Sequence, residues 1–347
     1  MLKPYISKVM HMENLTAEEA EQAMQIIMTG KATDAQIGGY LIALRIKGET
    51  VDEITGSARA MRAVASKVPY NVDGVPLLDI VGTGGDGAHS FNFSTAAAFV
   101  IAGAGRKVAK HGNRAASSLC GSADVLGALG VGLDLTPEQV AQCIDQIGIG
   151  FIFAPRFHPA MKYAIGPRRE LGQRTIFNLL GPLTNPAGVT HQLIGVYDPA
   201  LTEPLAEVLS QLGGRAAFVI HGYGGLDELT TSGPNRVSRL KDGQVTTYEL
   251  EAASLGLRPA GAEDLHGGDP AENAAIMRRV LACEDDSPRR DVVLFNTAAA
   301  LATVDGDFSG ALAEARQSLE SGAALEKLDR LVAYSQQLAH AQTAVHG

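Results

Sequence analysis

The sequence predicts an α/β protein with a small all-helical domain at the N-terminus and a larger domain built on a mostly parallel central sheet flanked by helices. Three observations support this fold class. Helix-capping patterns repeat over the first seventy residues, short aliphatic runs alternate with helical patterns from Val75 onward, and helical patterns return over the last hundred residues. Strands that alternate with helices are typical of parallel sheets whose faces are covered by helices.

The N-terminal segment is predicted to form three short helices. Thr16–Glu19, Thr33–Gln36 and Thr50–Glu53 each fit the capping box, in which a hydroxyl and a carboxyl or amide side chain satisfy two backbone N–H groups at a helix start. Gly30 and Gly48 stand where the first two helices should end. We therefore expect a small helical domain over residues 1–70, joined by helices from about residues 160–190.

Residues 71–347 are expected to form the large α/β domain. The predicted strands are Pro76–Val81, Arg106–Ala109, Ile149–Phe153, Gln192–Tyr197 and Ala216–Ile220. The predicted helices are Ser94–Ala104, Thr136–Ile147, one from Leu201, Asp269–Cys283 and Asp291–Val304. The second of these begins with another capping box, at Thr136. The segment Val237–Leu250 predicts a β-hairpin with an Asp-Gly turn. The segment Arg174–Pro186 ends a helical pattern in glycine and two prolines, which indicates a hinge between the domains.

Composition narrows the class of protein. The 347 residues are 46% hydrophobic and 19% charged, so the chain can bury a large core and wholesale disorder is excluded. The net charge of −9 argues against a nucleic-acid binder. Three widely spaced cysteines argue against a disulfide framework and a structural zinc. The N-terminus lacks a signal-peptide pattern and the longest apolar run, Ala96–Gly105, is too short to span a bilayer, so we expect a cytoplasmic protein that binds no membrane.

A glycine-rich segment follows the first predicted strand. Four glycines fall within Gly82–Gly87, and the next helical pattern begins near Ser94. Without Cβ atoms, backbone N–H groups can close on an anion, and the helix N-terminus adds further donors. The alternative is a tight strand-to-helix turn with Ser94 as a plain N-cap. The segment fits neither the dinucleotide-binding nor the P-loop pattern.

The segment Lys110–Ser118 gathers two fixed cations, a histidine, an asparagine and two hydroxyls after the second strand. Ligands of open α/β sheets bind at the carboxyl ends of the strands. Such a cluster suits a phosphate or pyrophosphate, with Lys110 as a point charge and the hydroxyls as neutral donors. A solvated polar loop is the alternative, although such loops more often contain Asp, Glu and Pro beside the cations.

Two adjacent carboxylates, Asp227 and Glu228, follow the strand Ala216–Ile220. Mg²⁺ in proteins binds one or two carboxylates together with substrate phosphates. By itself the pair is more typical of an exposed helix start. With two phosphate-type loops predicted at the same sheet edge, a magnesium site becomes the better interpretation.

Arg168 lies on a helical stretch, and its planar fork could bind a substrate carboxylate. An ion pair with a nearby glutamate is an equally good interpretation. His111, His158 and His191 show no metal-ligand spacing.

These segments, in this order, resemble the anthranilate phosphoribosyltransferases, the tryptophan-pathway family that joins anthranilate to 5-phosphoribosyl 1-pyrophosphate (PRPP). The resemblance covers nearly the whole chain. It rests on GTGGD at Gly82–Asp86, NxST at Asn92–Thr95, KHGNRAxSS at Lys110–Ser118, GxAD at Gly121–Asp124, RTIFNLLGPLTNP at Arg174–Pro186 and the Asp227-Glu228 pair. Cys120 and Gly127 depart from the family pattern at positions where no ligand contact is implied.

The resemblance implies a homodimer with the active site in the cleft between the two domains. It implies catalytic roles for Lys110, Asp227 and Glu228, and a Mg²⁺ held by Ser94, Asp227 and Glu228. Anthranilate would contact Gly82, His111, Asn113, His158 and Arg168. The implied PRPP site comprises Gly82, Gly85, Asp86, Ser90, Asn92, Phe93, Ser94, Thr95, Lys110, His111, Gly112, Asn113, Arg114, Ala115, Ala116, Ser117, Ser118 and Ser122.

The implied activity is transfer of the phosphoribosyl group from PRPP to the amino group of anthranilate. Two alternatives share the fold: a pyrimidine-type nucleoside phosphorylase, and a non-catalytic relative that binds nucleic acid. The phosphorylase would not require the acidic pair for Mg²⁺, and the nucleic-acid binder should be basic along its cleft. The acidic pair and the net charge of −9 favour the transferase.

Overall fold

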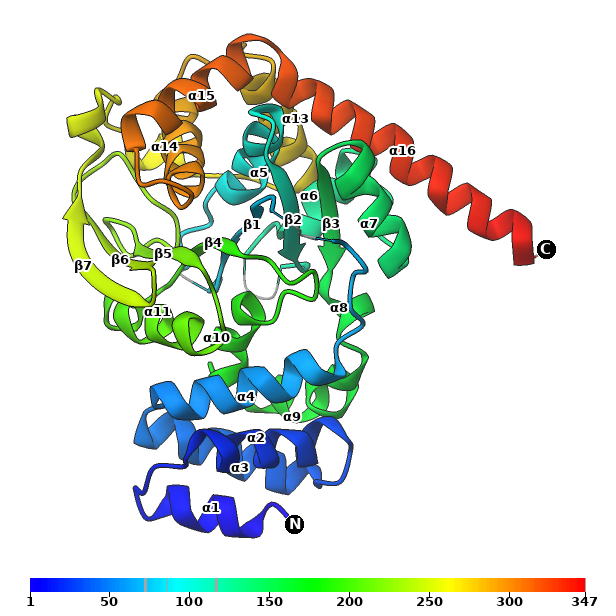
Figure 1. Cartoon of the computed structure of the whole chain (residues 1–347), viewed down its shortest axis with the longest axis vertical. Coiled ribbons are helices and arrows are strands. Elements are labelled where there is room, and N and C mark those ends of the chain that lie inside the picture. The colour runs from blue at the N-terminus through cyan, green and yellow to red at the C-terminus, as the bar shows by residue number, and fades with distance from the viewer. Residues whose placement is uncertain (72–73, 86, 116–117, 347) are drawn as a thin grey trace.

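The centre of the protein is a seven-stranded sheet (Figure 1). The computed structural model describes residues 1–71, 74–85, 87–115 and 118–346, with side chains described as far as residue 339. The strand order is β3-β2-β1-β4-β5-β6-β7; β1 to β5 are parallel, and β6 and β7 add an antiparallel hairpin. The strands are β1 Leu77–Gly82, β2 Lys107–Gly112, β3 Ile149–Phe153, β4 His191–Gly195, β5 Ala216–His221, β6 Asn235–Lys241 and β7 Gln244–Leu250. The mostly parallel sheet and the hairpin predicted from the sequence are confirmed.

Strand β1 is the point at which the direction of sheet assembly reverses. The chain adds β2 and β3 on one side of β1 and then returns to add β4 and β5 on the other. At such a point the connections leave the carboxyl ends of neighbouring strands in opposite directions, which opens a crevice for a ligand. Gly82 at the end of β1 pairs with Gly195 at the end of β4, so the glycine-rich segment begins at this crevice.

The N-terminal bundle contains four helices among the described residues, one more than the sequence predicts. They are α1 Lys3–Met10, α2 Ala17–Met28, α3 Asp34–Lys47 and α4 Val51–Val64. Thr16, Thr33 and Thr50 cap the last three in complete capping boxes, as predicted. Helix α1 has no side-chain cap and no acidic residue in its first turn, and its start is marked only by a proline.

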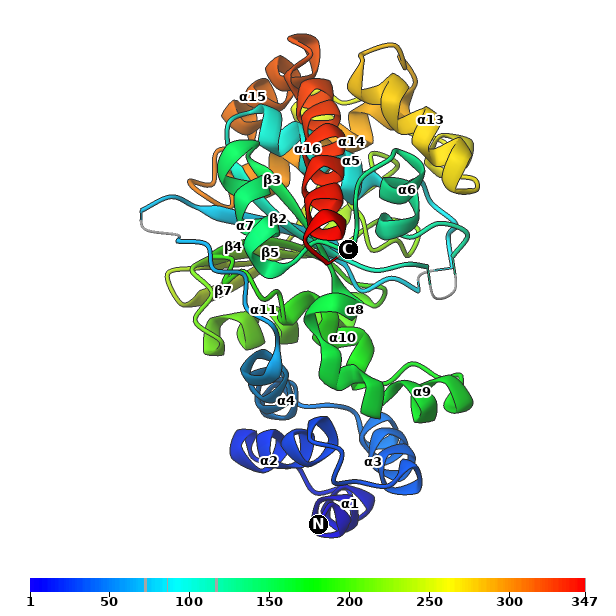
Figure 2. The ribbon, with the colours of Figure 1, turned by 90° about the vertical axis from the view of Figure 1, so that its right-hand side faces the viewer.

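The apolar core of the bundle continues into one face of the sheet. Buried residues of the bundle, such as Ile27 and Leu41, belong to the same cluster as Leu180, Leu205 and Val219 from the α/β region. The connecting helices are α8 Ala154–Phe157, a 3₁₀ turn Pro159–Tyr163, α9 Ile165–Leu171, α10 Ile176–Leu183 and α11 Thr202–Gln211, which follows a short 3₁₀ turn, Pro199–Leu201. Of the connecting helices, α10 and α11 lie between the bundle and the sheet, and α9 lies beside the bundle (Figures 1 and 2).

The opposite face of the sheet carries a second apolar cluster around α5, which is buried along most of its length. Its helices are α5 Phe93–Gly103, α6 Ser122–Ala128, α7 Pro137–Gln146, α12 Ala262–Leu265, α13 Pro270–Leu281, α14 Pro288–Ala302, α15 Phe308–Glu320 and α16 Ala323–His346. Thr136 caps α7 in the predicted capping box. Among the described helices, none combines the length and the apolar character that a membrane crossing requires.

Two boundaries bear on the site, and the first differs from the predicted one. Strand β2 continues to Gly112 because it pairs with β3 as far as Phe153, so Lys110 and His111 lie inside the sheet instead of in the loop after it. Helix α10 runs through Gly181 and Pro182 to Leu183. The helix therefore ends within the predicted segment, one residue after the first of its two prolines.

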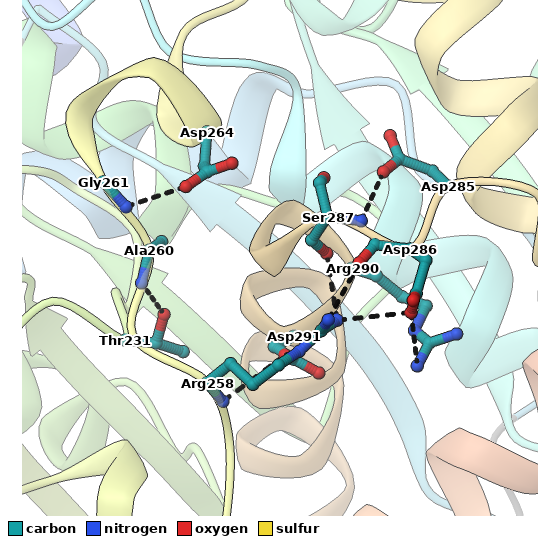
Figure 3. Close-up of polar contacts among 10 residues, drawn as sticks. All are labelled: Thr231, Arg258, Ala260, Gly261, Asp264, Asp285, Asp286, Ser287, Arg290 and Asp291. Carbon is teal, nitrogen blue, oxygen red and sulfur yellow. Dashed lines mark hydrogen bonds and ion pairs between the residues drawn. The ribbon is translucent and has the colours of Figure 1, made fainter.

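A polar network fastens the segment after the hairpin to the start of α14 (Figure 3). Arg258 donates from Nε to Oδ2 of Asp291 at 2.6 Å and from Nη1 to the carbonyl of Asp286 at 2.8 Å. The backbone N–H of Ala260 donates to the hydroxyl of Thr231. The network therefore joins α14 to the segment that follows Asp227 and Glu228.

Candidate active site

The two acidic residues contact the glycine-rich segment after β1 and the start of α5. The N–H of Gly84 donates to Oδ2 of Asp227 at 2.6 Å, and the N–H of Ser94, in the first turn of α5, donates to Oε1 of Glu228 at 3.1 Å. Both acidic residues are about nine-tenths buried. A carboxylate at the start of a helix interacts favourably with the helix dipole, and Glu228 lies at the N-terminus of α5.

Three glycines leave the room that the acidic pair occupies. A Cβ on Gly82 or Gly195 would collide with Asp227, and one on Gly222 would collide with the carbonyl of Glu228. The close approach of the backbones is therefore what seats the two carboxylates at the ends of β1 and β4. For Gly82, this is a structural reason for glycine in addition to any contact with a ligand.

The backbone beyond the acidic pair is held by a buried asparagine of α14. Asn296 accepts from the N–H of Leu229 at 3.0 Å and donates to the carbonyl of the same residue at 2.8 Å. These two hydrogen bonds satisfy the backbone N–H and carbonyl of Leu229, which has no partner strand in this irregular segment. Asp227 and Glu228 are thus carried on a rigid segment.

Lys110 lies inside the molecule, 2% exposed, and donates from Nζ to the carbonyl of Ile80 at 2.7 Å. Burial lowers the pKa of this ammonium group, and the neighbouring carboxylates of Asp79, Glu228 and Asp227 oppose that shift. In this conformation the cation balances the acidic groups beneath the sheet edge.

Sequence reasoning missed Asp79, which joins β1, β2 and the segment after α10. It accepts from the N–H of His111 at 3.1 Å and from Nδ2 of Asn185 at 2.8 Å. Asn185 also donates to the carbonyl of Ala109. Burial raises the pKa of Asp79 to about 6, although Lys110 opposes the shift. The signal was present in the sequence, since a charged residue within the apolar strand Leu77–Val81 requires a buried partner.

His111 and His158 form a buried pair with ring centroids 5.1 Å apart. Burial lowers the pKa of His111 to about 3 and that of His158 to about 4, so both rings are neutral at pH 7. His111 Nδ1 contacts the carbonyl of Gly181 in α10 at 3.2 Å. Among the described residues, neither Nε2 atom has a hydrogen-bond partner. A buried polar atom without a partner is costly, which favours a site that a ligand completes.

Arg168 packs over the ring of Phe177 at 5.0 Å, and burial lowers the pKa of its guanidinium group. No carboxylate within the described part of the chain pairs with it. The alternative of a surface Arg–Glu pair is therefore not what the structure shows. Phe177 and Gly181 are one turn apart on α10, so Arg168 and His111 approach the same face of this helix.

The loop after β2 is folded onto the start of α6. Asp124 accepts from the N–H groups of Gly121 and Ala115 and from Nη1 of Arg114. The carbonyl of Asn113 accepts from the hydroxyl of Ser122 at 3.3 Å. This network gives the Gly121–Asp124 motif a structural role. Of the remaining predicted residues here, Gly112 ends β2 and Ser118 is exposed, while Ala116 and Ser117 lie outside the described residues.

The segment before α5 contributes mainly backbone and packing. Asn92 donates to the carbonyl of Cys120 and accepts from Asn273, so its side chain is already bonded within the protein. Phe93 is buried and Thr95 has a buried hydroxyl without a described partner. Ser90 forms an isolated β-bridge with His266. Gly85 is the residue after Gly84, whose amide donates to Asp227. Asp86 lies outside the described residues.

Two family models together match most of the chain. The model described as the helical bundle domain of the glycosyl transferase family matches residues 3–65, and that described as its a/b domain matches residues 74–325. The anthranilate phosphoribosyltransferases of a Roseiflexus species (strain RS-1) and of Moorella thermoacetica are each 55% identical over 96% of this chain and 98% of their own length. The chain belongs to the anthranilate phosphoribosyltransferase family.

Solved structures of family members have the same fold. The enzyme from Thermus thermophilus superposes with a TM-score of 0.90 at 45% identity, covering 96% of this chain and 99% of that one. The enzyme from Saccharomyces cerevisiae, in complex with PRPP and Mg, gives a TM-score of 0.88 at 29% identity over 97% of this chain and 98% of the yeast chain. The predicted fold class is confirmed.

The donor set fits a magnesium ion that the family implies. Two carboxylates, Asp227 and Glu228, lie together at the sheet edge, each with one oxygen bonded to a backbone N–H. In the described part of the chain, no three His, Cys, Asp or Glu side chains gather into a metal-binding group. A pair of carboxylates such as Asp227 and Glu228 is the set of protein ligands that Mg²⁺ uses when substrate phosphates complete its coordination.

Proposed function

We propose that the protein transfers the phosphoribosyl group from PRPP to the amino group of anthranilate, giving N-(5-phosphoribosyl)anthranilate and pyrophosphate, the second step of the tryptophan branch. The pair of hydrogen bonds from Gly84 and Ser94 to Asp227 and Glu228 carries this proposal. They bring an anion-binding loop, a helix N-terminus and an acidic pair together at the crevice beside β1. The two substrates assigned to the site are those of the anthranilate phosphoribosyltransferase family, to which the chain belongs.

PRPP would lie over the glycine-rich segment and the loop after β2. The amides near Gly85, the N-terminus of α5 and the cation of Arg114 are the donors that its phosphates require. The side chain of Arg114 is 60% exposed and forms an ion pair with Asp124. It can therefore turn toward a phosphate at little cost in free energy. Asp86, Ala116 and Ser117 are proposed here on the family motif alone.

Asp227, Glu228 and the hydroxyl of Ser94 would hold Mg²⁺, which supplies positive charge to the departing pyrophosphate. The buried ammonium group of Lys110 interacts with both members of the acidic pair and balances part of their charge. The chain's own contribution is to hold these carboxylates in fixed positions before the substrate arrives.

Anthranilate would lie at the face of α10 that His111 and Arg168 approach. The guanidinium of Arg168, without a described carboxylate partner, would bind the carboxylate of anthranilate in its planar fork. The neutral rings of His111 and His158 would pack beside the aromatic ring and offer their Nε2 atoms. Asn113 and Gly82 complete the proposed contacts.

In the reaction, the C1–oxygen bond of PRPP breaks, pyrophosphate leaves with the electron pair, and the amino nitrogen of anthranilate bonds to C1 with inversion. The nitrogen then loses one proton to solvent. An aniline nitrogen is already neutral at pH 7, so no strong base is required. Catalysis therefore rests on stabilising the leaving group and on aligning the nitrogen with C1.

The fluorescence of anthranilate tests the proposal. Purified protein is mixed with anthranilate and PRPP, with Mg²⁺ and again with excess EDTA. We expect a loss of fluorescence that requires both substrates and the metal. An unchanged signal from folded protein would exclude the transferase, and phosphate-dependent cleavage of pyrimidine nucleosides would then support the phosphorylase alternative.

We also propose that the protein is a homodimer whose bundle faces a second copy. Large apolar side chains are exposed there at Met1, Met10, Met12 and Ile46. An exposed apolar patch is typical of a protein interface. Sedimentation velocity should give a dimer for the wild type and a monomer for Ile46→Asp.

The division into a small domain of residues 1–70, joined by helices from about 160–190, and a large domain of residues 71–347 is part of the same proposal. Helices α9 and α10 both contact α3 of the bundle, which supports it. Limited proteolysis should cut first between the two units.

A further inference from the structure

Arg174 lies immediately before α10 and reaches the end of β4. Its guanidinium carbon is 4.1 Å from the centre of the Tyr197 ring, the shortest cation–aromatic distance in the described part of the chain. Tyr197 stands two residues beyond β4, and β4 pairs with β1 up to Gly82. Stacking on an aromatic face restricts a guanidinium group to one plane. Arg174 is therefore oriented by the strand next to the glycine-rich segment.

The same guanidinium packs against the glycine-rich segment itself. A Cβ placed on Gly85 would lie 3.4 Å from both Nε and Nη2 of Arg174. Gly85 has a φ of +76°, a backbone conformation that side chains other than glycine rarely adopt. The preceding residue, Gly84, is bonded to Asp227. Two consecutive residues of the loop are thus held from different parts of the chain, one by a carboxylate and the next by a stacked cation.

Arg174 has no carboxylate partner among the described residues, and no hydrogen bond from its side chain is formed within them. Its charge therefore remains available at the loop that is proposed to bind pyrophosphate. Because Arg174 immediately precedes Thr175, the N-cap of α10, it also connects the loop to the helix that Arg168 and His111 approach.

We propose that Arg174, stacked on Tyr197, is a positioning residue that holds Gly85 so that the amides of the glycine-rich segment face the pyrophosphate group of PRPP. This inference rests on the proposed function and assigns to its site a residue pair outside the family's implied contact set. The planar stack fixes the loop, and the positive charge favours the anion that the loop binds.

Steady-state kinetics with four variants tests the pair. Arg174→Ala should raise the KM for PRPP about tenfold and leave the KM for anthranilate within about twofold, because Gly85, the residue that Arg174 contacts, is assigned to PRPP alone. Arg174→Lys should retain most of this defect, since an ammonium group cannot stack as a plane. Tyr197→Phe should behave as the wild type, and Tyr197→Leu should reproduce Arg174→Ala.

The matched control is Arg316→Ala. Arg316 is an exposed arginine of α15 without an ion pair in the described structure. Helix α15 lies on the far side of the sheet from α10 (Figure 1). The Arg316→Ala substitution should leave both KM values unchanged. Thermal unfolding of every variant separates loss of the fold from loss of positioning.

Calorimetry with inorganic pyrophosphate and Mg²⁺ gives a readout that does not depend on turnover. The Arg174→Ala and Tyr197→Leu proteins should bind pyrophosphate about tenfold more weakly than the wild type, and the double variant no more weakly than either single one. A wild-type KM for PRPP in folded Arg174→Ala, full rescue by lysine, or normal binding in Tyr197→Leu would each overturn the inference. Pyrophosphate binding by a wild-type protein that does not consume anthranilate would refute the proposed function while still testing Arg174.

Discussion

Gly84 and Asp227 are joined by a 2.6 Å hydrogen bond between residues 143 positions apart in the chain. The bond connects the loop after β1 to the segment after β5 without any ligand. It orients one carboxylate oxygen of Asp227 toward the backbone of the glycine-rich segment. The protein's own atoms therefore hold the glycine-rich segment against the acidic pair, and groups held in this way favour electrostatic catalysis without reorganisation.

Asp227→Ala should lower kcat at least about 100-fold, the range seen when one group that stabilises developing charge is removed. The fold should persist, because the segment stays bonded to Asn296. The anthranilate fluorescence assay measures the rate and circular dichroism checks the fold. Near-normal turnover would remove Asp227 from the mechanism. Asp227→Asn is the companion variant, since it keeps the size of the side chain and removes its charge.

Lys110→Ala should also lower kcat about 100-fold, because it leaves Asp79, Asp227 and Glu228 without their buried cation. The unpaired carboxyl groups then bind protons more readily. The acidic limb of the pH–rate profile should therefore move to higher pH, which a merely structural change would not produce. A profile that keeps its wild-type position would contradict this role for Lys110.

Gly195→Ala should abolish activity and lower the melting temperature, because the new methyl group collides with the backbone of Asp227. Gly127→Ala is the matched control. Gly127 is an exposed glycine of α6, where a Cβ meets only ordinary contact with Leu133. This control should keep full activity and gain about 0.5–1 kcal/mol of stability from helix propensity. Equal behaviour of the two variants would show that the backbone approach at Gly195 is unimportant.

Acidification from pH 7 to pH 5 should destabilise the protein. The pKa of His111 is lowered to about 3 and that of His158 to about 4, so the unfolded chain binds more protons and stability is lost as the pH falls below about 6.5. Each histidine therefore lowers the free energy of unfolding by about 2 kcal/mol between pH 7 and pH 5. Asp79 acts in the opposite direction, because its pKa is raised to about 6 and the folded chain binds its proton more readily. It therefore adds about 1 kcal/mol to the free energy of unfolding over the same pH range.

Urea unfolding of the wild type and of His158→Gln at both pH values measures this effect. The variant should lose about 2 kcal/mol less than the wild type on acidification, because glutamine does not titrate. Identical losses in the two proteins would mean that His158 is not buried in its neutral form.

Arg258→Ala should lower the free energy of unfolding by about 2 kcal/mol, since it leaves the buried carboxylate of Asp291 without its cation (Figure 3). The kinetic constants should not change, because α14 still carries Asn296. Arg278→Ala is the control: it breaks an ion pair with Asp329 in which both side chains are about half exposed, and should change stability by no more than about 0.5 kcal/mol. Equal effects of the two substitutions would contradict the importance of burial at Asp291.

Local structure was largely readable from the sequence alone. The capping boxes at Thr16, Thr33, Thr50 and Thr136 form as predicted, because a cap depends on residues only three positions apart. The alternation of strands and helices identified the parallel sheet, and the ordered motifs identified the family. Helix α1 was missed because its start carries no side-chain cap.

The tertiary structure alone decided which side chains meet. Pairing with β3 extends β2 past Ala109, and this takes Lys110 and His111 from a predicted loop into the sheet. Asp79 acquires its partner Asn185 from 106 positions away, and Arg174 meets Tyr197 and Gly85 only when α10 and β4 are in place. Such contacts depend on strand order and on close backbone approach, whereas helix caps and strand patterns are determined by neighbouring residues.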